Sequence, residues 1–188
     1  MKINTTTLAG TATLAALVVV FDYTMKYSGL KIVFPWLPVL KFDFTGIPIV
    51  LSLLLFGLIP GIFTSIIASV AILARSGQVV SSSMKGLAEL STILGMAVGL
   101  KLLNRFRMVG SFTLGITSRA LIMILVDLAL IYVGVISLPA SYADIPIMVA
   151  LLVGAFNAVQ GVLSILGGYF IYEAVKRRVP SLVKSNDR

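Results

Sequence analysis

The polar side chains that could do chemistry in this sequence lie inside long apolar segments, where polar groups are unusual. They are two carboxylates and two carboxamides: Glu89, Asp127, Asn157 and Gln160. In 156-FNAVQG-161 the two carboxamides are three residues apart, so on a helix they share one face. Two carboxamides offer hydrogen-bond donors and acceptors together, which suits a neutral heteroaromatic ligand better than an ion. The spacing therefore indicates a binding site for such a ligand.

The same four residues also have a structural interpretation. Amides inside a membrane often bond one helix to another, a contact worth about 0.6–2 kcal/mol. Ionisable groups there cost about 2.5–3.5 kcal/mol each on insertion scales, so they usually face a cavity or a partner. Because all four are expected in the outer half or near the midplane, we favour one shared cavity. We expect Arg119, by contrast, nearer the inner end, where it can extend to the surface in a structural role.

Several kinds of protein are excluded by composition. The chain has no histidine and no cysteine, which removes the commonest general base, thiolate metal sites and disulfides. It has no GxxxxGK[ST] phosphate loop, so we do not expect it to hydrolyse ATP itself. An intramembrane enzyme using only acids would need Glu89 and Asp127 together, and no sequence feature brings them together. We predict a protein that is not an enzyme and holds no metal ion.

The elements that must position these residues are apolar helices. Of the 188 residues, 59% are hydrophobic and 12% are charged, and the apolar runs lack strand-like alternation. We predict one all-α integral membrane domain in the cell (plasma) membrane, a compact bundle of six transmembrane helices over about 6–25, 44–58, 61–74, 85–103, 111–135 and 145–172. The second and third segments are shorter than the roughly 30 Å bilayer core. They are either short spans that meet at Pro60-Gly61 or a re-entrant hairpin.

The distribution of Lys and Arg sets the expected orientation. The formal net charge is +8, but the basic residues lie between the apolar segments and in the C-terminal tail. This is the pattern of membrane topology, so we do not expect nucleic-acid binding. With the N-terminus inside, most basic residues fall on the inner side, which predicts that both termini are cytoplasmic. No small-residue cleavage site follows the apolar run 8–21, so we expect it to be an uncleaved first span.

The first outer loop is too apolar for an ordinary aqueous linker. Its large apolar side chains are Phe34, Trp36, Leu37, Leu40 and Phe42, and two prolines stiffen it. Composition supports two interpretations equally. The loop is either a belt of aromatic anchors at the membrane interface or a lid over an outward-facing pocket.

Small residues recur at four-residue spacing, which allows helices to approach closely. For Gly57/Gly61 and Gly95/Gly99 we favour packing within this chain. Ala12 and Ala16, with Ala9 nearby, form a similar stripe on the first helix. The spacing does not decide whether this stripe packs within the chain or against a foreign helix.

The segment 41-KFDFTGIPIVLSLLLFGLIPGIFTSII-67 resembles the substrate-binding S component of energy-coupling factor (ECF) vitamin transporters. In that family a K-[YF]-D-[FL]-[ST]-x-[IV]-P pattern and a Gly-x-x-x-Gly turn open the second helix. The matching positions are Lys41, Asp43, Thr45, Pro48, Gly57 and Gly61. The segment 86-GLAELSTILG-95 resembles the family's G-E-L stretch, with Ala88 in place of its glycine.

Within this family the chain is most similar to the riboflavin-specific members. On the fifth helix Arg119 and Met123 match their pattern, but Asp127 replaces an asparagine. On the sixth helix Phe156 and Asn157 match their F-N-x-x-K pattern, but Gln160 replaces the lysine. Riboflavin is the first candidate ligand. Another heterocycle, such as thiamine, a pyridoxine-like compound or a modified-base precursor, is the rival.

The resemblance implies a mechanism and a set of functional residues. The protein would capture a vitamin from outside and dock on a membrane coupling (T) subunit, and two ATPase subunits would drive release inward as it topples in the bilayer. The implied ligand-binding residues are Lys41, Phe42, Asp43, Glu89, Met123, Asp127, Asn157 and Gln160. The implied docking residues are Ala9, Ala12 and Ala16. No cofactor is expected beyond the bound vitamin. An assembly or structural membrane protein without a ligand is the alternative.

Overall fold

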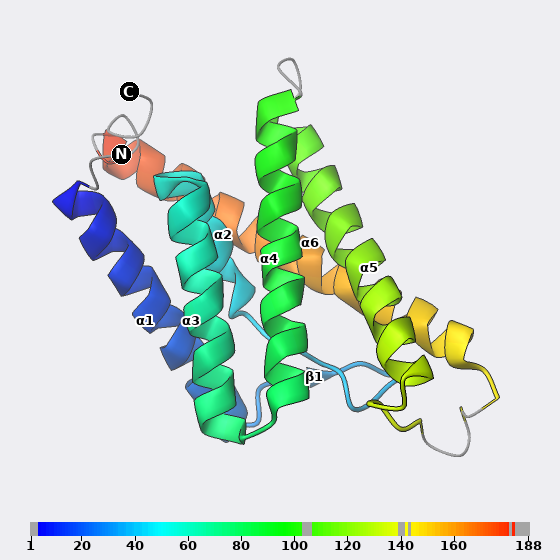
Figure 1. The fold of residues 1–188 in the computed structure, drawn as a ribbon. Coiled ribbons are helices and arrows are strands. Elements are labelled where there is room, and N and C mark those ends of the chain that lie inside the picture. The colour runs from blue at the N-terminus through cyan, green and yellow to red at the C-terminus, as the bar shows by residue number, and fades with distance from the viewer. Residues whose placement is uncertain (1–3, 103–106, 139–141, 143, 181, 183–188) are drawn as a thin grey trace.

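The computed structural model describes residues 4–102, 107–138, 142, 144–180 and 182, and in these residues the chain forms a bundle of six helices. The helices are α1 (Thr5–Tyr27), α2 (Gly46–Phe56), α3 (Leu58–Ser76), α4 (Val79–Leu102), α5 (Arg107–Tyr132) and α6 (Pro146–Arg178). Two short strands, β1 (Ile32–Val33) and β2 (Lys41–Phe42), lie between α1 and α2. Figure 1 shows α1, α3, α4 and α5 in a row, with α2 and α6 behind them.

Four helices, α1, α3, α5 and α6, are long and apolar enough to cross a membrane. This confirms the prediction of an all-helical, multi-pass membrane protein. At about 1.5 Å per residue, the 11 residues of α2 reach only about 16 Å. The 24-residue α4 is long enough, but it carries charged residues and is not among the four. The number of spans and the orientation of the termini stay predictions.

The turn between α2 and α3 lies at Gly57, so the predicted junction at Pro60-Gly61 is wrong. Gly57 has a φ of 94°, in a region that glycine adopts without strain. Pro60 instead lies in the first turn of α3, where the missing N–H would have no helical partner anyway. The two predicted short segments are therefore one half-length helix, α2, and one 19-residue helix, α3.

The half-length helix α2 forms the centre of the molecule. It packs against α1, α3, α4 and α6. Most of its residues are buried, and Ile49, Val50 and Leu53 join one apolar core with residues of α1, α3, α4 and α6. A helix that is apolar all round is stable only when it is enclosed. Figure 1 shows that α2 begins deep in the bundle, so the chain just before it also enters the interior.

The small-residue stripes have different surroundings. A Cβ atom at Gly95 or Gly99 would meet the backbone of α5 at Leu114 or Ser111, so these two glycines allow α4 and α5 to pack closely. This agrees with packing inside the chain. The side chains of Ala9, Ala12 and Ala16 are instead exposed on α1. Within the described residues, no helix covers that stripe.

Candidate functional site

The segment between α1 and α2, residues 28–45, folds as a hairpin, which we call the α1–α2 hairpin. Strands β1 and β2 pair antiparallel, with Ile32 opposite Phe42 and Val33 opposite Lys41. A backbone bond from the Phe34 N–H to the Leu40 carbonyl, at 2.9 Å, continues the pairing toward the tip. The hairpin is therefore an ordered element and not a linker.

An aromatic cluster holds the hairpin against α6. It consists of Phe34, Trp36, Phe42 and Phe156. The Phe156 ring centroid lies 4.7 Å from that of Phe42 and 5.6 Å from that of Phe34. These tilted and edge-on arrangements are favourable for aromatic pairs. Phe34 is buried, whereas Trp36 is 62% exposed.

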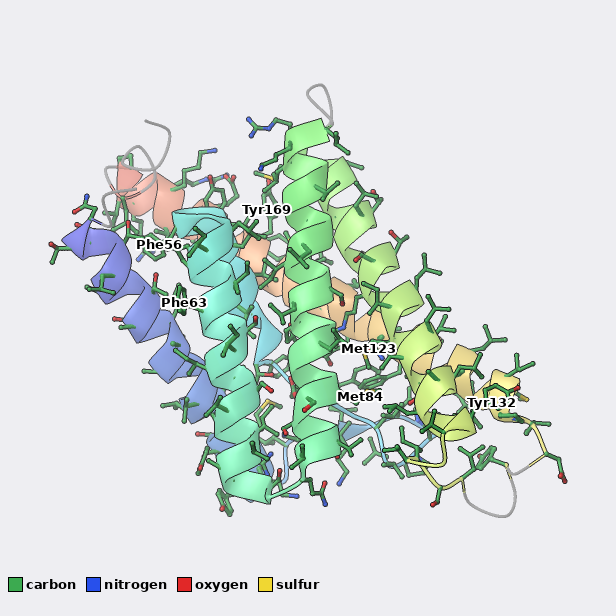
Figure 2. All side chains as sticks on the ribbon, in the orientation of Figure 1. Phe56, Phe63, Met84, Met123, Tyr132 and Tyr169 are labelled. Carbon is green, nitrogen blue, oxygen red and sulfur yellow. The ribbon has the colours of Figure 1, made fainter. Side chains whose placement is uncertain are left out.

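The tip of the hairpin covers the ends of three helices. Leu37 and Leu40 pack on a small apolar cluster of Ala88 from α4, Met123 from α5 and Val153 from α6. Figure 2 shows Met123 between α4 and α5 at this end of the bundle, close to Met84. The hairpin therefore covers the bundle as a lid would, and of the five large apolar side chains predicted to shape this loop, Trp36 is the exposed one.

Asp43 follows β2 directly and carries the end of the hairpin into the interior. Its carboxylate accepts hydrogen bonds from the Thr45 hydroxyl at 2.6 Å and from the Lys85 ammonium at 2.9 Å. Lys31 lies 3.9 Å from its second oxygen. Burial by itself raises the pKa of Asp43, but Lys85, the Thr45 hydrogen bond and Lys31 together lower it to about 2. Asp43 is therefore ionised and fixed at neutral pH.

Gln160 binds the backbone of Asp43 with both ends of its carboxamide. Its Nε2 donates to the Asp43 carbonyl at 2.7 Å, and its Oε1 accepts from the Asp43 N–H at 3.3 Å. A further, longer contact runs from Nε2 to the Ser164 hydroxyl at 3.4 Å. Gln160 is fully buried. In this structure the side chain therefore ties the hairpin to α6.

Arg119 lies in the interior, so the prediction that it extends toward the inner surface is wrong. It is only 1% exposed. Its Nε donates to Asn157 Oδ1 at 3.1 Å, and one terminal nitrogen lies 3.1 Å from Glu89 Oε1. The physical reason is depth. The middle of α5 faces a carboxylate on α4, and a buried guanidinium is stable beside such a partner.

Glu89 and Asn157 complete a continuous buried polar chain of Asp43, Lys85, Glu89, Arg119 and Asn157. Lys85 contacts both carboxylates, at 2.9 Å from Asp43 and 3.0 Å from Glu89. Lys85 and Arg119 form ion pairs with Glu89, but among the described residues no hydrogen-bond donor is well aligned with its carboxylate. Asn157 also donates to the Val153 carbonyl at 2.9 Å. The chain connects the hairpin with α4, α5 and α6.

A second ionic cluster extends this chain to α1 and α3. Asp22 of α1 is fully buried and pairs with Lys31 of the hairpin at 2.9 Å and with Arg75 of α3. Lys31 links the two groups through its contact with Asp43. Asp22, Lys31, Arg75 and Lys85 were not predicted to belong to the site. An aspartate close to the end of an apolar run was the available signal for Asp22.

The predicted site residues therefore fall into separate groups. Asp43, Glu89, Asn157 and Gln160 are brought together in the interior. Phe42 lies on the hairpin strand β2 just before Asp43, and Met123 lies under the hairpin tip. Asp127 is buried one turn along α5 from Met123, and within the described residues it has no hydrogen bond or ion pair. Lys41 is exposed on β2, and Lys85 is the lysine that pairs with Asp43.

Two surface hollows occur away from these residues. One lies at the start of α6 and is lined by residues 144–148 and Leu151, and the other lies between α3 and α4 beside Ser69 and Gly86. Neither is lined by Asn157 or Gln160. The carboxamides are bonded to protein groups here, so a ligand that uses them must replace those contacts. A ligand cavity at these two residues stays a prediction.

Comparison with known proteins bears on the fold of this chain. No protein-family model matches the chain, and no curated protein matches its sequence. A solved structure described as the S component of a bacterial ECF transporter matches with a TM-score of 0.74 and 17% sequence identity, over 92% of this chain and 96% of that chain. At such a low sequence identity, the match shows a shared fold and does not by itself show a shared ligand or activity. The chain therefore has the fold of an ECF transporter S component.

Proposed function

We propose that this chain is a substrate-capturing S component that binds a small vitamin-like heterocycle beneath the α1–α2 hairpin. The single observation that carries the proposal is the fold match, which extends over nearly the whole of both chains. The motif 41-KFDFTGIP-48 supports it independently, because this segment forms the hairpin end and the deep start of α2. On this proposal the protein is a transporter subunit of the plasma membrane and not an enzyme.

The ligand would lie between the hairpin and the ends of α4, α5 and α6. The aromatic cluster provides ring faces for stacking, and buried polar groups would orient the ligand's edge. We assign the ligand contacts to Phe42, Asp43, Glu89, Met123, Asp127, Asn157 and Gln160, with Lys41 at the rim. Riboflavin is the first ligand to test, followed by thiamine, pyridoxine-like compounds and modified-base precursors.

Ligand entry would require the hairpin tip to move. Leu37 and Leu40 now fill the space beside Met123. Moving them exposes apolar surface, which bound ligand would cover again. The ionic contacts of Lys31 and Asp43 lie at the base of the hairpin. They would hold the base in place while the tip opens.

Transport would depend on partner subunits. The exposed stripe of Ala9, Ala12 and Ala16 would dock on a membrane coupling subunit, where small side chains allow close helix contact. The chain has no phosphate-binding loop of the Walker type, so two separate ATPase subunits would supply the energy for release.

Mass spectrometry of ligand that copurifies with the protein tests this function. We expect a stoichiometric small heterocycle, with flavin absorbance and quenched fluorescence if the ligand is riboflavin. The result that contradicts the proposal is protein that carries no small molecule and is not stabilised by any vitamin in a thermal-shift screen. A structural membrane protein is the alternative then favoured, and the protein-satisfied carboxamides already agree with it.

A further inference from the structure

The buried carboxylates of this chain are not equivalent. Asp22, Asp43, Glu89 and Asp127 are all between 0% and 7% exposed. The first three each have a Lys or Arg nitrogen within 3.1 Å. Asp127 has no cation and no hydrogen-bond donor in the parts of the chain that the structure describes. Among the buried carboxylates of the described residues, Asp127 is the one without a nearby cation.

The neighbouring sequence does not provide the missing cation. Residues 133–145, which connect α5 to α6, contain no Lys or Arg. Residues 139–141 and 143 lie outside the described part, but they are Pro, Ala, Ser and Ala. A buried carboxylate without a cation opposes folding, and in membrane helices such a group is a mark of function.

Asp127 continues the buried face of α5 that carries Met123. It lies four residues after Met123, so both side chains project from one face of α5. Met123 packs with Val153 and with the hairpin tip. Val153 is three residues before Phe156, whose ring contacts Phe42 and Phe34. Asp127 therefore lies one turn beyond the Met123–Val153 contact that the hairpin tip covers, and the ring of Phe156 lies on the other side of that contact.

We infer that the captured ligand is a heteroaromatic cation, with Asp127 as its counter-ion and the aromatic cluster against its ring. This inference rests on the proposed function and narrows its ligand class. A carboxylate attracts a cationic ring strongly where water is excluded, and aromatic faces add cation–π attraction. Riboflavin has an N–H donor on its ring edge but no positive charge, so its attraction to the Asp127 carboxylate would be weaker. The other buried acids already have protein cations.

Ligand binding by purified protein tests the charge requirement. The probes are thiamine, which has a permanently charged thiazolium ring, and riboflavin, which is neutral. We expect the wild-type protein to bind thiamine more tightly, and Asp127→Asn to weaken thiamine binding at least about tenfold while riboflavin binding stays the same or improves. Asp144→Asn is the matched control, because Asp144 is an exposed carboxylate at the same end of the bundle.

The stability of the ligand-free protein gives a second readout that does not depend on the choice of probe. Removing an unpaired buried charge relieves its desolvation, so Asp127→Asn is expected to leave the melting temperature unchanged or to raise it. A lower melting temperature would show that Asp127 has a structural partner and would overturn the inference.

The remaining outcomes separate the two proposals. Riboflavin binding tighter than thiamine, thiamine binding unaffected by Asp127→Asn, or no binding of either probe would each overturn the cationic-ligand inference. If the cationic-ligand inference is rejected but a small molecule copurifies with the protein, the proposed capture function still holds. Only protein without a copurified ligand and without stabilisation by any vitamin counts against the capture function itself.

Discussion

The interior beneath the α1–α2 hairpin and the outward face of α1 are opposite in character. Beneath the hairpin, the charges of the buried polar chain touch an opposite charge or a carboxamide, and residues far apart in sequence hold one another. On α1, Ala12 and Ala16 are exposed and have no helix against them in the described residues. Substitutions in a closed interior lower the stability of the fold. Substitutions on an exposed small-residue face leave the stability of the isolated protein unchanged but impair the binding of a partner. Substitutions in the two regions should therefore separate folding from transport.

The largest loss of stability is expected from Arg119→Met. This change leaves Glu89 with one cation instead of two and removes the donor to Asn157. Breaking a buried pair costs on the order of 3–5 kcal/mol. The melting temperature in detergent measures the effect. The matched control is Arg177→Met, an exposed arginine on α6, which should change stability by less than about 0.5 kcal/mol. Equal effects would show that the polar chain does not stabilise the interior.

Acidification should give the next largest effect. The folded-state pKa of Asp43 is about 2 and its ordinary value is 3.8, so its ionised form contributes stability that is fully present above about pH 4. That contribution, about 2 kcal/mol, is lost as pH falls from about 4 through 2. Unfolding measured between pH 2 and 6 should show the loss, and Asp43→Asn should flatten the profile in this window. A wild-type profile with the same slope as the variant would contradict the ionic role of Asp43.

Gln160→Ala should lower stability less than Arg119→Met does and should have a local effect on the hairpin. It removes two hydrogen bonds to the Asp43 backbone, together worth about 1–3 kcal/mol. Hydrogen exchange should become faster at the Asp43 amide and along β2. Gln78→Ala, at an exposed glutamine beside α4, is the control and should leave exchange in the hairpin unchanged. Unaltered protection in Gln160→Ala would mean that the carboxamide does not fasten the hairpin.

The smallest effect on the isolated protein is expected from Ala12→Trp. Because Ala12 is exposed, its stability and ligand binding should change little, within about 0.5 kcal/mol. ATP-driven uptake in vesicles with the coupling module should be lost, since a bulky side chain blocks close helix contact. Ala15→Trp, three residues along the same helix but buried, should instead destabilise the fold. Normal uptake by Ala12→Trp would remove the docking role from this face.

Much of the fold could be predicted from the sequence. The helices lie close to the predicted segments, because unbroken apolar runs in lipid satisfy their backbone groups only as helices. The α2–α3 junction was misplaced, since Pro60 is a stronger sequence signal than Gly57, although only Gly57 adopts the turn conformation. The hairpin strands were missed because two-residue strands leave no periodic pattern.

The candidate site could be predicted only in part. Asn157 and Gln160 were identified as unusual, but their spacing does not reveal that each bonds to protein groups. Lys85, Lys31 and Arg75 were missed, because lysines and arginines near helix ends have the same pattern whether they face lipid headgroups or buried acids. For the same reason Arg119 was predicted to extend to the inner surface, although it is buried.

Composition and hydrophobic runs by themselves determined that this chain is a helical membrane protein with a few costly polar residues in its interior. Only the tertiary structure decided which of those residues meet. Gln160 binds a residue 117 positions away, and Arg119 reaches a partner 38 positions away. Such pairings depend on which helices are adjacent and at what depth their side chains cross. One short buried helix, α2, sets that depth by bringing Asp43 into the centre of the bundle. Tertiary structure also leaves Asp127 as the one buried acid without a partner in the described part of the chain.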